Sequence, residues 1–112
     1  MAEKRLSKKA NSVETNIAFE FETKGDTLIV KLAGEADLVG SSKLRQALVR
    51  RLDGIHNIVF DLSELNFADS YFLRLLIKLR KRLGGVSSVK LINTRPNIKR
   101  ILELTGLDKV FL

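Results

Sequence analysis

Three aspartates lie where expected strands and helices meet. Asp37 follows the second expected strand, Asp61 ends a short apolar strand, and Asp69 precedes a helix. Carboxylates gathered at one edge of a sheet can hold Mg²⁺ and support a metal-assisted hydrolase. Aspartate is also a common helix cap and turn residue, and in those roles it needs no ligand. We therefore interpret the three residues as structural and keep the metal enzyme as a third hypothesis.

The residue types of a hydrolase triad are also present, in Ser70, His56 and Asp61, but nothing in their spacing aims them at one another. His56 is the single histidine and there is no cysteine, which excludes a multi-histidine metal site, a thiolate metal site, a disulfide and a cysteine nucleophile. The pair Gly84-Gly85 lacks the lysine and the following helix of a phosphate-binding loop. We expect no enzymatic activity and no cofactor or metal.

The length of 112 residues, with 45% hydrophobic residues, predicts one domain with one core. The net charge is +7, from 20 Lys and Arg against 13 Asp and Glu. Residues 1–12 hold four of the basic residues and one large apolar residue besides Met1, so we expect a flexible basic tail followed by a single domain over residues 13–112. One Tyr and no Trp give no base-stacking platform, so we expect no nucleic-acid partner. The absence of a long apolar run and of cysteine predicts no membrane contact and a cytoplasmic location.

Hydrophobic periodicity predicts the elements that position these residues. Apolar residues alternate over 17–21 and 28–32, which predicts a β-hairpin turning at Gly25, and residues 34–37 are expected to break it. Ser41 or Ser42 is expected to cap a helix that runs to about Leu52. The continuous apolar run 58–60 predicts a central strand covered on both faces, which ends at Asp61.

The second half alternates between helices and strands. A loop over 62–69 is expected to lead into a helix over 70–83 that Gly84 ends, and residues 89–92 are expected to form a strand. A third helix is expected from Pro96 to just before Gly106, followed by a short strand over 110–112. The predicted class is α/β, with an N-terminal β-hairpin, then alternating βα units, and a mixed, mostly parallel sheet with packed helices.

The start of the second helix, residues 66–73, is the most informative segment. Unpaired backbone N–H groups and the positive end of the helix dipole meet there. A phosphate on a hydroxyl at such a place adds nearly two negative charges and would change any docking surface built around it. Ordinary capping by Asp69 and Ser70 accounts for the same residues without a function.

Four stretches match a known bacterial family in their order and spacing. They are residues 34–37 (Gly-Glu-Ala-Asp), 59–63 (Val-Phe-Asp-Leu-Ser), 67–70 (Phe-Ala-Asp-Ser) and, most specifically, 95–111. With these stretches the sequence resembles the STAS domain (sulfate transporter and anti-sigma factor antagonist) in its small stand-alone form. The resemblance covers residues 17–112 and implies the STAS-like fold.

The resemblance implies a protein-binding switch. Antagonists of this family bind an anti-sigma factor, often one with a histidine-kinase-like ATPase fold, and thereby release a sigma factor for transcription. An anti-sigma kinase phosphorylates the second serine of an Asp-Ser-Ser-Gly signature, which blocks the complex, and a phosphatase restores it. The implied partners are therefore an anti-sigma factor that can be a serine kinase, and a phosphatase.

The sequence departs from this pattern at the phosphorylated position. Residues 69–72 read Asp-Ser-Tyr-Phe, so Tyr71 occupies the place of the phosphorylated Ser or Thr and Phe72 replaces the glycine. A phenolic oxygen lies farther from its Cα than a seryl oxygen, so a serine kinase would not place a phosphate on it. Ser70 is the nearest hydroxyl, one residue early. We expect serine switching to be lost or altered, and Ser70 to be unmodified.

Three consequences of this departure stay open. The chain could be a constitutive antagonist that docks its partner with Tyr71 and Phe72 as an aromatic anchor. It could use Ser70 or Tyr71 as a shifted phosphosite. It could also be a degenerate STAS module that binds another protein, a small ligand or a nucleotide. Phe72 could equally turn into the core, because it shares the apolar stripe of its helix.

The expected partner-binding surface centres on residues 63–74, with residues 35–42 beside it. Its members are Glu35, Asp37, Ser41, Ser63, Asp69, Ser70, Tyr71, Phe72 and Arg74. Many members of the family continue with a closing helix where this sequence ends, so apolar surface left open could support a weak homodimer.

Overall fold

The N-terminal hairpin forms because two alternating stretches meet across a tight turn. Strands β1 (Ile17–Lys24) and β2 (Thr27–Ala36) pair antiparallel, and Gly25 takes a φ of 61° between them, which glycine adopts without strain. The computed structural model describes residues 16–85 and 87–112. The basic tail expected over residues 1–12 therefore lies outside the described residues.

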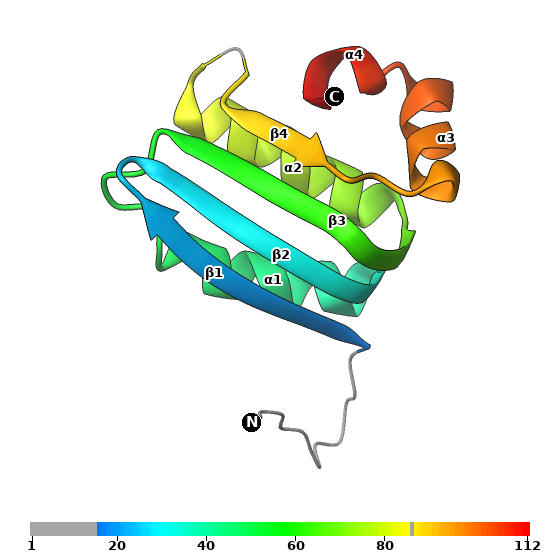
Figure 1. Cartoon of the computed structure of the whole chain (residues 1–112), viewed down its shortest axis with the longest axis horizontal. Helices are drawn as coiled ribbons and strands as arrows, with labels where there is room; N and C mark the ends of the chain where they lie inside the picture. The colour runs from blue at the N-terminus through cyan, green and yellow to red at the C-terminus, as the bar shows by residue number, and fades with distance from the viewer. Residues whose placement is uncertain (1–15, 86) are drawn as a thin grey trace.

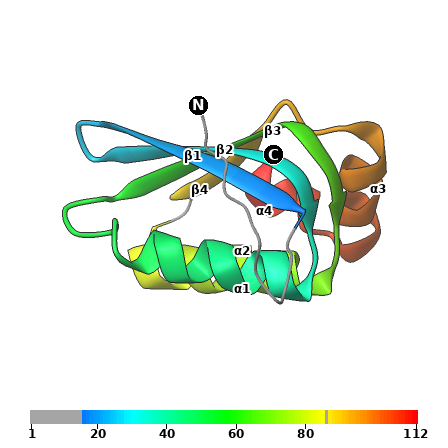
Figure 2. The same cartoon turned by 90° about the horizontal axis from the view of Figure 1, so that it is seen from below.

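Two parallel strands extend the hairpin into a mixed four-stranded sheet in the order β1-β2-β3-β4. The remaining elements are α1 (Leu38–Val49), β3 (Asn57–Ala68), α2 (Ser70–Leu83), β4 (Val89–Ile92), α3 (Pro96–Thr105) and α4 (Asp108–Phe111). Helices α1 and α2 lie side by side on one face of the sheet, and α3 and α4 lie beyond β4 (Figures 1 and 2). The predicted α/β class, with its hairpin and mostly parallel sheet, is confirmed.

The core lies between the sheet and the pair α1 and α2. Leu28, Val30 and Leu32 of β2 alternate toward the helices and have no exposed surface. The fully buried rings of Phe60 and Phe72 meet edge to face, with centroids 6.0 Å apart. The other face of the sheet lies away from α1 and α2 (Figure 2). The expectation that the central strand is covered on both faces is therefore wrong, and Val59 on the open face is only half-buried.

Both central strands run farther than expected. The expected break at residues 34–37 is wrong, because β2 continues to Ala36 with shifts of register on either side of Ala33 and Gly34. A Cβ at Gly34 would collide with the Asn16 carbonyl, so only glycine allows the two strands to approach this closely. The expected loop over 62–69 is also wrong, because β3 continues to Ala68 as the parallel partner of β2.

Two shorter expectations are also corrected. Helix α1 begins at Leu38 because Asp37, and neither Ser41 nor Ser42, is its cap, and it ends at Val49. The last segment is the one-turn helix α4 instead of a strand, because the Leu107 carbonyl accepts hydrogen bonds from the backbone N–H groups of Val110 and Phe111. The bounds expected for α2, β4 and α3 are confirmed.

No helix among the described residues combines the length and the apolar character that a membrane crossing needs.

Candidate functional site

The starts of α1 and α2 lie next to each other because β2 and β3 end as paired strands. Ala36 and Ala68 are partners in the register, and each is followed by the aspartate that caps a helix. The backbone N–H of Asp69 donates to the Ala36 carbonyl at 3.3 Å, which extends the pairing to the helix start. The sheet therefore brings together two segments that lie more than thirty positions apart in the sequence.

Both aspartates act as helix caps. A carboxylate oxygen of Asp37 accepts a hydrogen bond from Gly40 N at 2.8 Å, and one of Asp69 accepts from Tyr71 N at 2.9 Å. Each bond satisfies a backbone donor that has no partner inside its helix. The structural interpretation of these two residues is confirmed, and no group of three metal-ligating side chains occurs within residues 16–85 and 87–112.

Ser70 and Tyr71 occupy the first positions of α2. Ser70 is exposed, and its hydroxyl makes no hydrogen bond to another described residue, since Asp69 serves as the cap. The Tyr71 side chain is 43% exposed, and the Arg74 guanidinium lies 5.9 Å from its ring centroid. This distance fits a cation–π contact that holds the ring against its own helix. Both residues are thus exposed at the helix start.

Large apolar side chains gather around the two helix starts. Leu38 is 52% exposed, Val39 42%, Phe67 44% and Tyr71 43%. We call these four residues the helix-start surface. Exposed apolar side chains are common singly, but a group of this kind is typical of a surface that another molecule covers.

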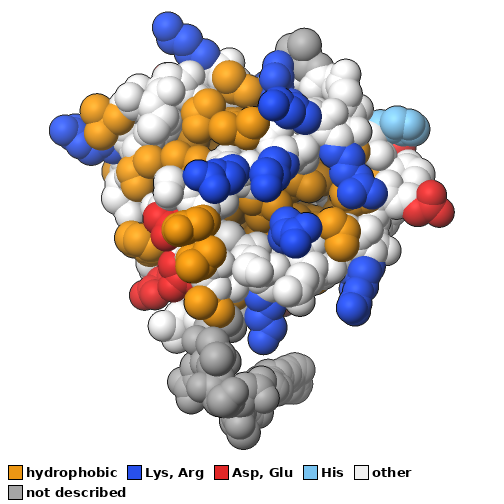
Figure 3. All heavy atoms as spheres, turned by 180° about the vertical axis from the view of Figure 1, so that it is seen from behind, with side chains coloured by type: hydrophobic (Ala, Val, Ile, Leu, Met, Phe, Trp, Pro, Cys, Tyr) orange, Lys and Arg blue, Asp and Glu red, His pale blue; other side chains and the backbone are white. Residues whose placement is uncertain are grey.

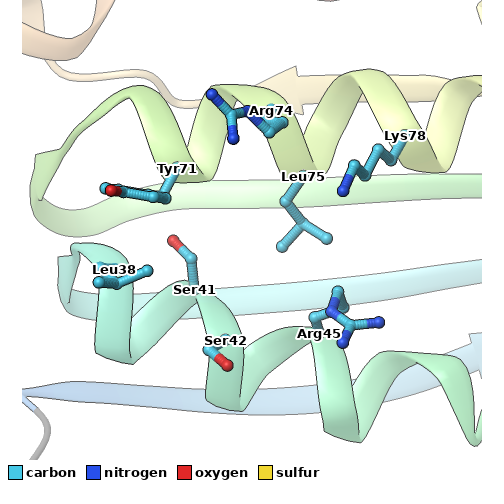
Figure 4. Close-up of a pocket in the computed structure, with 8 residues that line it drawn as sticks. All are labelled: Leu38, Ser41, Ser42, Arg45, Tyr71, Arg74, Leu75 and Lys78. Carbon is cyan, nitrogen blue, oxygen red and sulfur yellow. The ribbon is translucent and has the colours of Figure 1, made fainter.

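A groove runs from the helix-start surface between α1 and α2. Its volume is about 190 Å³, and its lining consists of Leu38, Ser41, Ser42 and Arg45 from α1 and Tyr71, Arg74, Leu75 and Lys78 from α2. The residues of each helix are spaced i, i+3, i+4, i+7, which is one face of a helix. Figure 4 shows Ser41 and Leu75 pointing into the space between the helices, with Arg45 and Lys78 farther along. We call this feature the α1–α2 groove.

The charge of the chain concentrates on these two helices. Two Lys and Arg residues lie on α1 and five on α2, and neither helix contains Asp or Glu. Figure 3 shows basic side chains spread over this face with hydrophobic side chains between them, and acidic side chains toward its margins. An anionic partner would meet an attractive field here.

Three of the predicted site residues are placed differently from expectation. Phe72 has no exposed surface, so its assignment to a partner-contacting anchor is wrong and the alternative, a core position, is confirmed. Ser41 is 4% exposed and lines the α1–α2 groove without presenting a surface of its own. Ser63 lies on β3, where its carbonyl accepts a hydrogen bond from Arg95 Nε at 2.9 Å, because the expected loop is a strand. Glu35, Asp37, Asp69, Ser70, Tyr71 and Arg74 lie at or beside the helix starts.

Asp61 belongs to a polar network on the β4 side of the sheet. Its carboxylate accepts hydrogen bonds from Ser63 N at 3.0 Å and from Asn93 Nδ2 at 3.1 Å. Burial by itself would raise the pKa of Asp61, but these hydrogen bonds and the nearby charge of Lys31 outweigh it and hold the pKa below its ordinary value. His56 lies 3.3 Å from Asp26, so the triad residue types are not combined.

Sequence reasoning missed Arg45, Leu75 and Lys78 as residues of the groove. It assigned the two basic residues to solvated helix faces and Leu75 to the core face; the assignment of Leu75 is confirmed, since that residue is 5% exposed and also lines the groove. The two i, i+3, i+4, i+7 stripes were visible in the sequence, but their alignment depends on the Ala36–Ala68 pairing.

Comparison with known proteins gives consistent results. The family model described as "MlaB, STAS domain" matches residues 19–112. The chain is 34% identical over 102 residues to the anti-sigma F factor antagonist of Paenibacillus polymyxa, covering 85% of this chain and 84% of the relative. The structure of an anti-sigma factor antagonist from Mycobacterium paratuberculosis superposes with a TM-score of 0.74 at 31% identity, covering 85% of this chain and 82% of the other. Unphosphorylated SpoIIAA has the same fold, with a TM-score of 0.72 at 22% identity and coverage of 85% and 86%.

Proposed function

Because this chain belongs to the STAS domain family, we propose that it is an anti-sigma factor antagonist whose helix-start surface binds an anti-sigma factor and thereby releases a sigma factor. The names of the similar proteins from Paenibacillus and Mycobacterium support this role. The observation that carries the proposal is the group of four large apolar side chains, each more than 40% exposed, around two capped helix starts.

Tyr71 is the central contact in this proposal. Its ring lies at the mouth of the α1–α2 groove and is held by Arg74, so little side-chain freedom is lost when a partner covers it. Tyrosine is among the residues that most often dominate binding energy at protein interfaces. Phe72 does not join it, because that ring fills the core.

The first experiment measures binding to an anti-sigma factor captured from the native host with the full chain as bait. Tyr71→Ala is expected to weaken binding by about 1–2 kcal/mol in calorimetry, because an anchoring ring is lost. Ile77→Ala is the matched control, since Ile77 is an exposed apolar residue of α2 outside the groove, and its affinity should stay unchanged. Equal affinity of the wild-type protein and Tyr71→Ala would remove Tyr71 from the interface. A captured set without an anti-sigma factor would reject the function itself.

We further propose that the antagonist is constitutive, with no serine switch. Incubation with ATP and a captured partner that is a kinase should leave the mass of the protein unchanged, because Tyr71 stands at the phosphorylated position. Tyr71→Ser should restore phosphorylation. Phe72 stays in place in this variant, because its replacement by glycine would open a cavity in the core. Phosphate on Ser70 of the wild-type protein would contradict the proposal.

A further inference from the structure

The shape of the α1–α2 groove fits a single helical segment of another protein. Its lining spans eight residues along each helix, from Leu38 to Arg45 and from Tyr71 to Lys78, which is a length of about 10 Å or two helical turns. A helix laid into a groove between two helices makes contact through residues at this same spacing.

The groove changes character along its length. Leu38 and Tyr71 form an apolar end at the helix starts, and Leu75 points into the space between the helices (Figure 4). Arg45 and Lys78 follow about two turns later, seven residues after Leu38 and Tyr71, and make the other end cationic. An occupant that matches this order carries an apolar side chain at one end and acidic side chains about two turns away.

The cations of the groove are not neutralised by the described part of the chain. Within residues 16–85 and 87–112 the ion pairs join Lys24 to Glu22, Lys31 to Glu64 and His56 to Asp26, and none involves a cation of α1 or α2. Helices α1 and α2 contain no acidic residue that could provide such a pair. Within the described residues these cations thus have no acidic partner, and a partner's carboxylates would meet complementary charge here.

The Ser41 side chain gives an independent indication. It is 4% exposed, its hydroxyl has no hydrogen-bond partner in the described structure, and it points toward α2 between the helices (Figure 4). Buried hydroxyls are normally hydrogen-bonded, so an unpaired one that faces a groove marks a place where a polar group of another molecule can bind.

From these observations we propose that the α1–α2 groove binds an acidic amphipathic helix of a partner protein, with an apolar side chain over Leu38 and Tyr71 and carboxylates against Arg45 and Lys78. The inference rests on the proposed function and gives the chemistry of the partner's docking segment. A nucleic acid or a free anion fits less well, because a phosphate would leave the apolar surface of Leu38, Tyr71 and Leu75 uncovered.

The test uses two synthetic fluorescent peptides of about four helical turns. The first carries leucines on one face and glutamates beside them, and the second has lysine at every glutamate position. Fluorescence anisotropy with the full chain should show binding of the glutamate peptide and none of the lysine peptide. Arg45→Glu combined with Lys78→Glu should lower the affinity for the glutamate peptide at least about tenfold. Lys43→Glu combined with Lys81→Glu changes the charge of the same helices equally but outside the groove. This control should lower the affinity for the glutamate peptide less than about threefold.

Three outcomes would overturn the proposal. They are no binding of the glutamate peptide, equal losses in the two double variants, and displacement of the peptide by inorganic phosphate or a short DNA duplex at matched ionic strength. This assay contains no anti-sigma factor. A groove that binds the peptide while the host yields no anti-sigma factor would therefore reject only the proposed function. If an anti-sigma factor is captured and its affinity depends on Tyr71, but the glutamate peptide does not bind the groove, only the proposed role of the groove is rejected.

Discussion

The outer face of α1 and α2 and the open face of the sheet differ in the arrangement of their charged residues. On the sheet, Lys31 lies between Glu20 on β1 and Asp61 on β3 in the strand register, and it forms an ion pair with Glu64 at 3.9 Å. Acidic and basic side chains thus alternate across neighbouring strands, which is a favourable cross-strand arrangement. The helices carry seven basic residues and no acidic residue.

The two faces differ in how their charges are arranged. On the sheet face, acidic residues of the neighbouring strands lie beside Lys31, so part of the charge is paired within the fold. The helix face combines mutual repulsion of its cations with exposed apolar side chains, and neither feature stabilises the monomer. The proposed partner would cover this surface and bring the opposite charge.

The strongest test separates the inner and outer sides of α2 at adjacent positions. Phe72→Ala should lower the free energy of unfolding by about 3–5 kcal/mol, because it empties a fully buried position against Phe60. Tyr71→Ala should cost less than about 1 kcal/mol, because its ring is half in solvent. Urea denaturation measures both values. Similar losses would mean that Tyr71 belongs to the core and that the outer face is not free for a partner.

A smaller effect distinguishes the two charged faces directly. Lys31→Glu should destabilise the fold by about 0.2–1 kcal/mol, because it places like charges on neighbouring strands beside Glu20 and Asp61. Lys78→Glu should raise stability by about 0.2–0.5 kcal/mol, because it faces Arg74 and Arg82 one turn away on either side. Thermal unfolding of the two variants gives the comparison. A loss of stability in Lys78→Glu would show that the helix face is not internally repulsive.

The smallest effect concerns acid stability on the sheet side. Because the folded pKa of Asp61 lies below its unfolded value of about 3.9, the ionised carboxylate contributes stability that is present above that pH and lost as the pH falls through the folded pKa. Asp61→Asn should therefore flatten the decline in stability below about pH 4. Denaturation midpoints at a series of acidic pH values measure this slope. Parallel declines in both proteins would contradict the role of Asp61.

The sequence was sufficient where one element carries its own start and stop residues. Helix α2 has a buried stripe, a capping aspartate and Gly84 in the left-handed conformation with φ 75°, and its predicted bounds agree with the structure. Helix α3 similarly has Pro96 in its first turn and Gly106 after its end. Such elements are defined by local physics.

Prediction failed where a residue's environment depends on distant strands. Residues 62–69 were expected to form a loop, but residues 62–68 belong to β3, and Glu64, Leu65, Phe67 and Ala68 pair with β2. The candidate site was also predictable only where a local pattern marks it, since Tyr71 and Asp69 were found from a short motif. The α1–α2 groove was not predictable in this way, because it depends on two helices that strand pairing brings into alignment.

The Ala36–Ala68 pairing has a consequence for regulation. Because each helix starts immediately after one of two hydrogen-bonded strand ends, the pairing of the central strands fixes the spacing of the two starts. The proposed binding surface is thus preassembled, and little ordering entropy would oppose association. Control over a module with this arrangement can act through its concentration, through competitors or through covalent marking, none of which requires the two helix starts to separate.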